Sequence, residues 1–245
     1  MKSEQISNKD SPVFEREHDA VPNELLMGNI PIGAMDIILE QSHIWNMHIY
    51  FLILCQILTG LRSGEALNLS QEISPYGSSF KFTVVSGNIT DIAIDLRYKH
   101  QMRADGKAVG GIKQPRIHHV YPDYVPVFLD GYSEHLTYLC AQKYDSAYMP
   151  LFPDRNGNAM TCESYRYAFR KLVKERVLPL AEKAADTDVK AFAAQLKTDT
   201  LTPNALREYY AADLARKGLD IGIIQTYCGD KVPVITAEEF SSQSS

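Results

Sequence analysis

The chain has 245 residues, of which 45% are hydrophobic and 22% charged, with a formal net charge of -5. These values are typical of a soluble globular protein with one main domain and a substantial core. The longest nearly uncharged run, residues 44–61, contains too many polar side chains for a membrane span and indicates a buried helix. No secretory signal opens the sequence, so we expect a cytoplasmic protein that makes no membrane contact.

The cysteines give no sign of a metal site or a disulfide framework. They lie far apart, without the paired spacing of zinc ligands, at Cys55, Cys140, Cys162 and Cys228. Cysteines in this arrangement are typical of reduced thiols in a reducing compartment. We therefore expect neither a zinc site nor a disulfide framework.

The charges are unevenly distributed. The negative sum argues weakly against a nucleic-acid partner, because DNA-binding proteins usually present a basic face. Two segments are nevertheless locally basic, and each alone is more often a solvated face than a binding surface. The first segment contains a single acidic residue, Asp105, and six basic ones: Arg97, Lys99, Arg103, Lys107, Lys113 and Arg116. The second contains Arg166, Arg170, Lys171, Lys174 and Arg176.

Residues 1–23 are polar and are expected to form a flexible leader or the remnant of a linker. From Pro31 onward, apolar spacing predicts a first helix that leads into an apolar helix ending at residue 58. Residues 80–96 are rich in Phe, Val, Ile and Thr and predict two strands separated by a turn at residues 86–88. A further short strand is expected at residues 117–121.

Helical periodicity returns after residue 125. It predicts four helices in this part of the chain. The first ends before residue 150, and the others span residues 161–177, 201–217 and 221–227, the last of them short. Thr161 has the signature of an N-cap for the second of these helices. The charged, alanine-rich residues 181–197 predict one solvent-facing helix or a pair of short ones. The expected fold class is therefore mainly α with a small antiparallel β-sheet (α+β).

Residues 59–69 place an arginine where a buried helix ends. Gly60 is a helix stop signal, and residues 63–69 predict a second helix with Glu65 in its first turn, where the helix dipole favours a carboxylate. Arg62 would then be braced between two helices and could hold a phosphate or carboxylate through two parallel hydrogen bonds. A purely structural Arg62–Glu65 pair explains this stretch equally well.

Several segments, in this order and spacing, together resemble the catalytic domain of tyrosine recombinases, the phage-integrase family. They are residues 59–67, the basic hairpin, Leu151-Phe152-Pro153, and residues 201–207, 211–218 and 224–229. The resemblance covers about residues 24–240 and implies a catalytic domain over residues 24–245. It also implies that the family's N-terminal core-binding domain is absent, since the preceding residues are too few to form one.

The resemblance implies site-specific recombination or integration of DNA, by cleavage and rejoining through a covalent phosphotyrosine link, without a metal or other cofactor. Arg62 and Arg207 match the two arginines that stabilise charge on the phosphate oxygens. Lys113 best matches the lysine that protonates the leaving 5′ oxygen, and Lys107 is the second choice. Glu65 would orient the site by hydrogen bonding. The implied partners are double-stranded DNA, from a mobile genetic element, and further copies of the chain on that DNA.

Three positions depart from the family pattern. Asn204 replaces a histidine, and its amide can hydrogen-bond a phosphate oxygen but cannot move a proton. Asp230 follows Gly229 where the family has histidine or tryptophan, and an acid beside a phosphate is unfavourable unless it turns away or pairs with an arginine. Phe240 occupies the region where the nucleophilic tyrosine is expected, and a phenylalanine has no hydroxyl with which to attack.

Phe240 leaves two hypotheses open. It is either an introduced replacement that holds the protein on uncut DNA, or the mark of a natural relative that kept the fold as a non-cleaving DNA-binding protein. A substitute nucleophile at Tyr209, Tyr210 or Tyr227 is a third option, although their helical positions favour a core role.

DNA contacts outside the reacting centre are expected from a small set of basic side chains, with the helix over residues 161–176 as the candidate for base contacts. The set is Lys107, Arg116, Arg166 and Arg170. A protein-interaction domain of helical fold, which the acidic net charge allows, is the unrelated alternative.

Overall fold

The computed structural model describes residues 30–98 and 102–229, so the expectations for residues 1–23, Asp230 and Phe240 lie outside the described residues. The elements in chain order are α1 (Ile32–Trp45), α2 (Met47–Thr59), α3 (Ser63–Ala66), β1 (Phe80–Val85), β2 (Asn88–Asp95), β3 (Ile117–His119), the 3-10 helix η1 (Pro122–Tyr124), α4 (Val125–Gln142), α5 (Cys162–Leu172), the π-helix η2 (Val173–Val177), α6 (Leu178–Ala181), α7 (Thr187–Thr198), α8 (Asn204–Arg216) and α9 (Ile221–Cys228). The expected fold class, mainly helical with a small antiparallel sheet, is confirmed.

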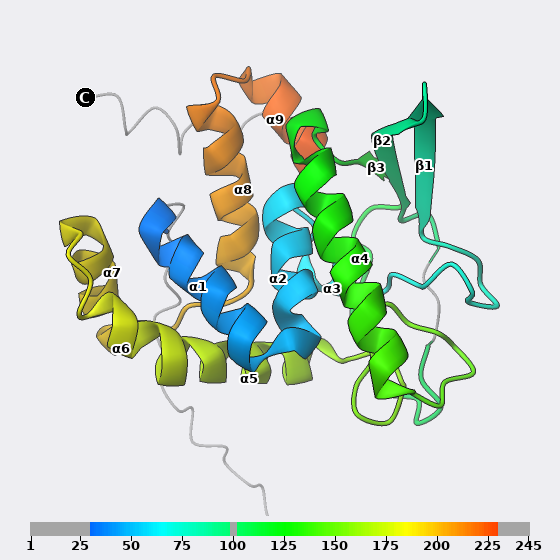
Figure 1. Cartoon of the computed structure of the whole chain (residues 1–245), viewed down its shortest axis with the longest axis horizontal. Helices are drawn as coiled ribbons and strands as arrows, with labels where there is room; N and C mark the ends of the chain where they lie inside the picture. The colour runs from blue at the N-terminus through cyan, green and yellow to red at the C-terminus, as the bar shows by residue number, and fades with distance from the viewer. Residues whose placement is uncertain (1–29, 99–101, 230–245) are drawn as a thin grey trace, which may run out of the picture.

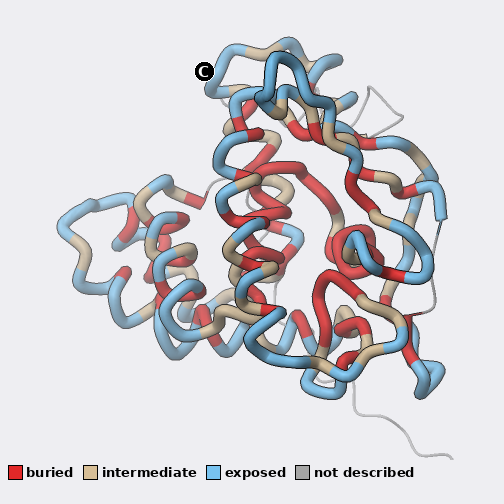
Figure 2. The backbone as a smooth tube through the Cα atoms, turned by 45° about the vertical axis from the view of Figure 1, so that its right-hand side comes forward, coloured by how far each residue is buried: buried red, intermediate tan, exposed pale blue. Residues whose placement is uncertain are grey.

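Helix α2 forms the centre of the molecule. It packs against α1, α4, α5 and α8, and Figure 1 shows these helices gathered around it, with α5 crossing beneath. Its side chains are buried over almost the whole length, as expected of a helix that is apolar on all faces. Figure 2 shows buried residues in many segments, with exposed residues on the outer turns. The preceding helix, α1, ends at Trp45, and Asn46 interrupts the helical conformation between α1 and α2.

The sheet lies at one edge of the helical layer and has the antiparallel order β1-β2-β3. Ser86 and Gly87 connect β1 to β2 with φ of 52° and 84°, the two positive values that a tight two-residue hairpin turn requires. Phe80 of β1 is buried against Phe128 and Tyr132 of α4, so this end of the sheet belongs to the core. The predicted hairpin is confirmed, and the third strand is shorter than expected.

The C-terminal half is built on a long helical segment. Thr161 caps α5 through its Oγ1, which accepts the Ser164 N–H at 3.1 Å, so the predicted N-cap is confirmed. The segment continues without a break through η2 and α6. Helix α7 is not simply solvent-facing as expected, because Val189 and Phe192 are buried where it packs against α1 and α6.

Two further observations concern the whole described chain. All four cysteines are free thiols. Within residues 30–98 and 102–229, every helix is too short or too polar to cross a lipid bilayer.

Two buried histidines make stability depend on pH. His118 donates from Nε2 to the Thr59 carbonyl at 2.7 Å, and His135 donates to the Leu151 carbonyl at 2.8 Å. Burial lowers the pKa of each to about 4, from an ordinary value of 6.5. Both rings are therefore neutral in the folded protein at pH 5, whereas the unfolded chain protonates them.

We expect the free energy of unfolding to fall as the pH is lowered from 6.5 to 4. The unfolded state binds more protons in this window, so each histidine contributes a slope of about 1.4 kcal/mol per pH unit. Urea unfolding followed by circular dichroism at several pH values measures this slope. His135→Gln, which keeps an amide donor for the Leu151 carbonyl, should make the slope shallower by one histidine's share; an unchanged slope contradicts the assignment.

Candidate active site

The site is organised around the corner between α2 and α3. Gly60 ends α2 in the left-handed conformation, with φ of 66°, which confirms the predicted helix stop. A Cβ at this position would lie 2.4 Å from Cδ1 of Tyr210, so α8 packs directly against the backbone of the corner. The Arg207 guanidinium donates from Nη1 to the Gly60 carbonyl. The two arginines matched to the phosphate pair, Arg62 and Arg207, thus come from distant parts of the sequence to the same corner.

Glu65 connects the parts of this corner. Its side chain is fully buried, and Oε2 accepts the backbone N–H of Arg62 at 3.1 Å. The Arg116 guanidinium donates to both carboxylate oxygens, at 2.8 Å and 3.1 Å, and Nη1 of Arg62 lies 3.5 Å from Oε1. Burial alone would raise the pKa of Glu65, but the hydrogen bonds and charges of Arg116 and Arg62 outweigh it and lower the pKa. Glu65 is therefore ionised at neutral pH.

The helix that starts here is shorter than the sequence predicts. A helix over residues 63–69 was expected, and α3 makes a single turn. Beyond it, the Leu69 carbonyl accepts the Leu151 N–H at 2.8 Å, and Ser70 forms a β-bridge with Pro150. Pairing with this distant segment replaces the next helical turn.

Arg116 occupies an internal position in the structure. Its side chain is only 15% exposed, and both terminal nitrogens are bonded to Glu65. Gly229, at the end of α9, packs against the same guanidinium, because a Cβ there would lie 2.4 Å from Nε of Arg116. Arg116 was expected to contact DNA, and that contact stays a prediction; in the structure its terminal nitrogens bond to Glu65. Its position within a basic segment could not reveal this role.

The two candidate lysines flank the glycines through which their loop contacts α3. Gly64 of α3 lies against the loop before β3, since a Cβ on Gly64 would be 2.7 Å from the Gly111 carbonyl oxygen. Lys113 follows Gly111 by two residues, a span of at most about 7 Å, and its side chain is exposed. Lys107 precedes Gly110 by three residues and is also exposed, with Nζ 3.9 Å from Asp105 Oδ2. Both lysines therefore lie close in sequence to the point where this loop contacts α3, and the choice of Lys113 over Lys107 stays a prediction.

Two other arginines of the first basic segment are engaged within the protein. Arg103 is buried and donates to Asp105 and Asp154, with shortest distances of 2.6 Å and 2.9 Å. Arg97 donates to Asp95 at 2.7 Å. The local excess of positive charge seen in the sequence is therefore partly neutralised in the fold.

The remaining candidates lie on α8 and α9. Asn204, the first residue of α8, is exposed and precedes Arg207 by one helical turn. Tyr210 is fully buried, as its periodic position predicts, and burial raises its pKa. Tyr209 and Tyr227 are half-buried and pack against Arg216 and Tyr121 respectively. Burial raises the pKa of both hydroxyls as well.

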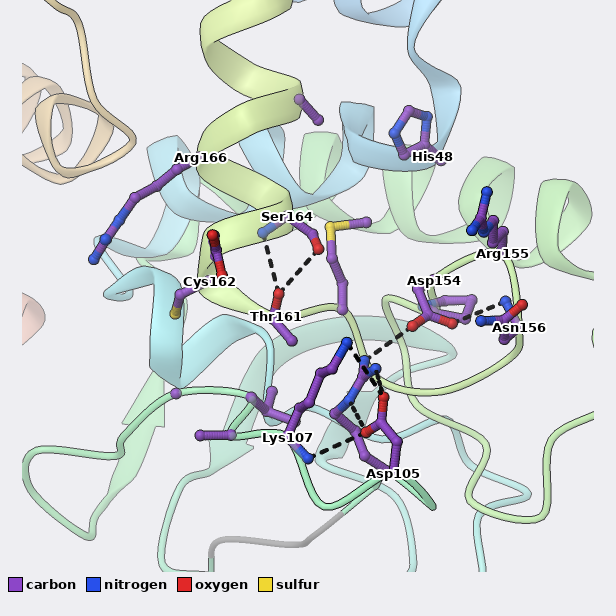
Figure 3. A pocket seen from close by; sticks show the side chains of 18 of the residues that line it. His48, Asp105, Lys107, Asp154, Arg155, Asn156, Thr161, Cys162, Ser164 and Arg166 are labelled. Carbon is purple, nitrogen blue, oxygen red and sulfur yellow. Dashed lines mark hydrogen bonds and ion pairs between the residues drawn. The ribbon is translucent and has the colours of Figure 1, made fainter.

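A groove of about 1070 Å³ adjoins the corner. Figure 3 shows its walls: the loop carrying Lys107, the loop carrying Arg155, and the start of α5 with Arg166. The groove reaches the corner at Gly110, where a Cβ would lie 2.7 Å from the Cα of Gly64. Arg170 is exposed one turn farther along α5 and does not line the groove.

The arrangement of elements is shared with several solved structures. XerA recombinase matches 88% of this chain at a TM-score of 0.55 with 15% identity, over 63% of its own chain. XerH site-specific recombinase, bound to difH substrate in a pre-cleavage complex, matches 90% of this chain at a TM-score of 0.54 with 17% identity, over 54% of its own chain. A tyrosine-to-phenylalanine variant of the Tn1549 transposon integrase, in complex with transposon right-end DNA, matches 85% at a TM-score of 0.56 with 18% identity, over 60% of its own chain.

The chain therefore has the fold of a tyrosine recombinase catalytic domain, and it spans less than two thirds of the length of each of these three proteins. No family model matches its sequence, and no curated protein matches it either.

Glu65→Gln should destabilise the protein by about 3 kcal/mol, because the substitution leaves the Arg116 guanidinium partly buried without its counter-charge. Urea unfolding at pH 7 measures the loss, with the exposed Glu163→Gln on α5 as the matched control. The pKa of Glu65 is lowered on folding, so its contribution is present above about pH 4.5 and is lost as the pH falls through the folded-state pKa. The two proteins should therefore converge in acid, and equal stability at pH 7 would contradict the role of Glu65.

Proposed function

We propose that this chain is the catalytic domain of a site-specific DNA recombinase or integrase that breaks and rejoins DNA strands through a phosphotyrosine intermediate, and that Phe240 blocks cleavage in the present sequence. One observation carries the proposal. Arg62 and Arg207 meet at one corner, where Arg207 holds the carbonyl two residues before Arg62, within a recombinase fold. Strand transfer needs two such donors, because it consumes no metal and must stabilise charge on the phosphate oxygens.

The electrostatics of the corner suit an anionic substrate. Glu65 places a negative charge within reach of Arg62, and this alone would weaken phosphate binding. Arg116 balances that charge through two hydrogen bonds to the carboxylate. Glu65 thereby fixes the backbone of Arg62 while most of its charge is balanced by a residue other than the proposed phosphate ligands.

Proton transfer and attack are assigned to the other matched positions. Lys113, exposed on a loop anchored to α3, supplies the proton for the leaving 5′ oxygen. Asn204 donates a hydrogen bond to a phosphate oxygen and takes no part in proton transfer. Phe240 stands at the sequence position matched to the nucleophile. The Tn1549 integrase variant bound to DNA supports the view that a recombinase with phenylalanine in place of tyrosine can hold its substrate.

The DNA duplex runs from the corner along the groove. Lys107, Arg155 and Arg166 line it from three separate segments, and Arg170 extends the basic face along α5. Contacts of this kind to phosphates position the duplex, and α5 supplies any contact to base edges. Self-association into dimers or tetramers accompanies binding to DNA from a mobile genetic element.

The most direct functional test restores the nucleophile. Phe240→Tyr, incubated with a nicked suicide substrate, should form a covalent protein–DNA adduct that survives denaturant. In this background Arg62→Ala or Arg207→Ala should slow adduct formation by about a hundredfold, the usual loss for one preorganised donor. Arg97→Ala, which removes an arginine already bonded to Asp95, is the matched control and should change the rate little.

Failure to form any adduct while DNA binding persists would contradict the proposal that the chain belongs to a cleaving enzyme. It would favour the alternative, a naturally non-cleaving DNA-binding protein of this fold. A loss of only a few-fold on removing either arginine would show that the wrong pair has been assigned.

The groove gives a separate prediction that the Phe240 chain itself can test. Lys107→Ala and Arg166→Ala should each reduce the slope of log K against log salt by about 1, because each removes one phosphate contact. Fluorescence anisotropy with a labelled duplex at several salt concentrations measures the slope. Lys190→Ala, an exposed lysine on α7, should leave it unchanged. Absence of DNA binding even at low salt would instead favour the protein-interaction alternative.

A further inference from the structure

A buried amide lies directly behind the Arg62 corner. Gln56 of α2 is fully buried, and its Nε2 donates to the Leu61 carbonyl at 3.0 Å and contacts the Ser63 hydroxyl at 3.4 Å. One side chain therefore holds the residues immediately before and after Arg62. Because a carbonyl can only accept a hydrogen bond, the amide nitrogen must face the corner, and Oε1 must face away from it.

The oxygen of this amide is held from another helix. Oε1 of Gln56 accepts a hydrogen bond from the hydroxyl of Tyr165, on α5, at 2.6 Å. Tyr165 is also fully buried, and burial raises the pKa of its hydroxyl, which therefore stays protonated and able to donate. The contact joins residues 109 positions apart in the sequence. It fixes the orientation of the amide, and through it the two residues on either side of Arg62.

Helix α5 braces the corner at a second point. The N–H of Cys162, the first residue of α5, donates to the Val109 carbonyl at 3.2 Å. The next residue, Gly110, lies between α5 and α3, since a Cβ on Gly110 would be 2.8 Å from Sγ of Cys162 and 2.7 Å from the Cα of Gly64. The start of α5 thus supports the loop that covers α3, while Tyr165 supports the corner from behind.

Packing alone does not require this polar pair. A buried amide and a buried phenol cost free energy unless their hydrogen bonds are made, whereas apolar side chains of the same shape fill the space without that cost. What the pair adds is direction, because its hydrogen bonds fix where the Leu61 carbonyl and the Ser63 hydroxyl lie. The outward face of the same α5 carries the exposed Arg166 and Arg170.

We propose that Gln56 and Tyr165 are positioning residues for Arg62. The Tyr165–Gln56 hydrogen bond fixes the α2–α3 corner relative to α5, so that α5 and Arg62 contact DNA as one rigid unit. Neither side chain touches the substrate. The catalytic consequence rests on the proposed function, whereas the structural consequence can be measured on the chain as it stands.

Hydrogen–deuterium exchange tests the structural consequence. Tyr165→Phe removes only the hydroxyl, and peptides covering residues 61–67 should then exchange about fivefold to tenfold faster, as expected for the loss of one buried hydrogen bond. Tyr132→Phe is the matched control, because it removes a buried tyrosine hydroxyl on α4, where the ring packs against Phe80. It should leave residues 61–67 unchanged. Equal exchange in both variants would overturn the proposal.

Cleavage kinetics test the catalytic consequence in the Phe240→Tyr background. Tyr165→Phe should lower the single-turnover rate at saturating DNA about tenfold and change the Kd for DNA less than twofold. When Arg62→Ala is already present, Tyr165→Phe should cost little more, because its effect acts through that arginine. Fully additive losses would overturn the positioning role. If the Phe240→Tyr chain forms no adduct at all, the proposed function fails, and the exchange experiment still decides the inference.

Discussion

The buried carboxylate of Glu65 is the constraint on which the corner depends. A carboxylate inside a protein is costly unless it is paired, and Glu65 is paired by the guanidinium of Arg116 and the backbone of Arg62. Arg116 immediately precedes β3 and also packs against Gly229 at the end of α9. One ion pair therefore connects the α2–α3 corner to the sheet and to the last described helix. The fold and the candidate chemistry therefore share the same residues.

Close approach of backbone segments is the second requirement of the site. Gly60 admits the ring of Tyr210, and Gly64 admits the loop at Gly110. A side chain at Gly60 or Gly64 would push away α8 or the lysine-bearing loop. Together with the Tyr165–Gln56 hydrogen bond, these contacts leave the corner little freedom to move. Rigidity of this kind is what charge stabilisation requires, since preorganised donors need no rearrangement during the reaction.

The sequence predicted contacts between residues that are close in the chain better than contacts between distant segments. The helix stop at Gly60, the Glu65 contact with Arg62 and the Thr161 cap depend on residues within four positions of one another, and the sequence indicated all three. Contacts between distant segments left no local pattern. Arg116, the partner of Glu65, is 51 residues away, so their contact was not predicted from the sequence. Arg207 was assigned from the family resemblance, which draws on the order of many segments.

The central claim is that Arg62 and Arg207 form one phosphate clamp supported by Glu65 and Arg116. The most direct measurement is a crystal structure of this chain, with Phe240 retained, bound to a duplex containing its target site. The oxygens of a single phosphate should lie about 3 Å from both guanidinium groups, with the Glu65–Arg116 pair intact. A duplex bound elsewhere on the surface, or a phosphate held by Arg116 after its release from Glu65, would contradict a clamp formed by Arg62 and Arg207.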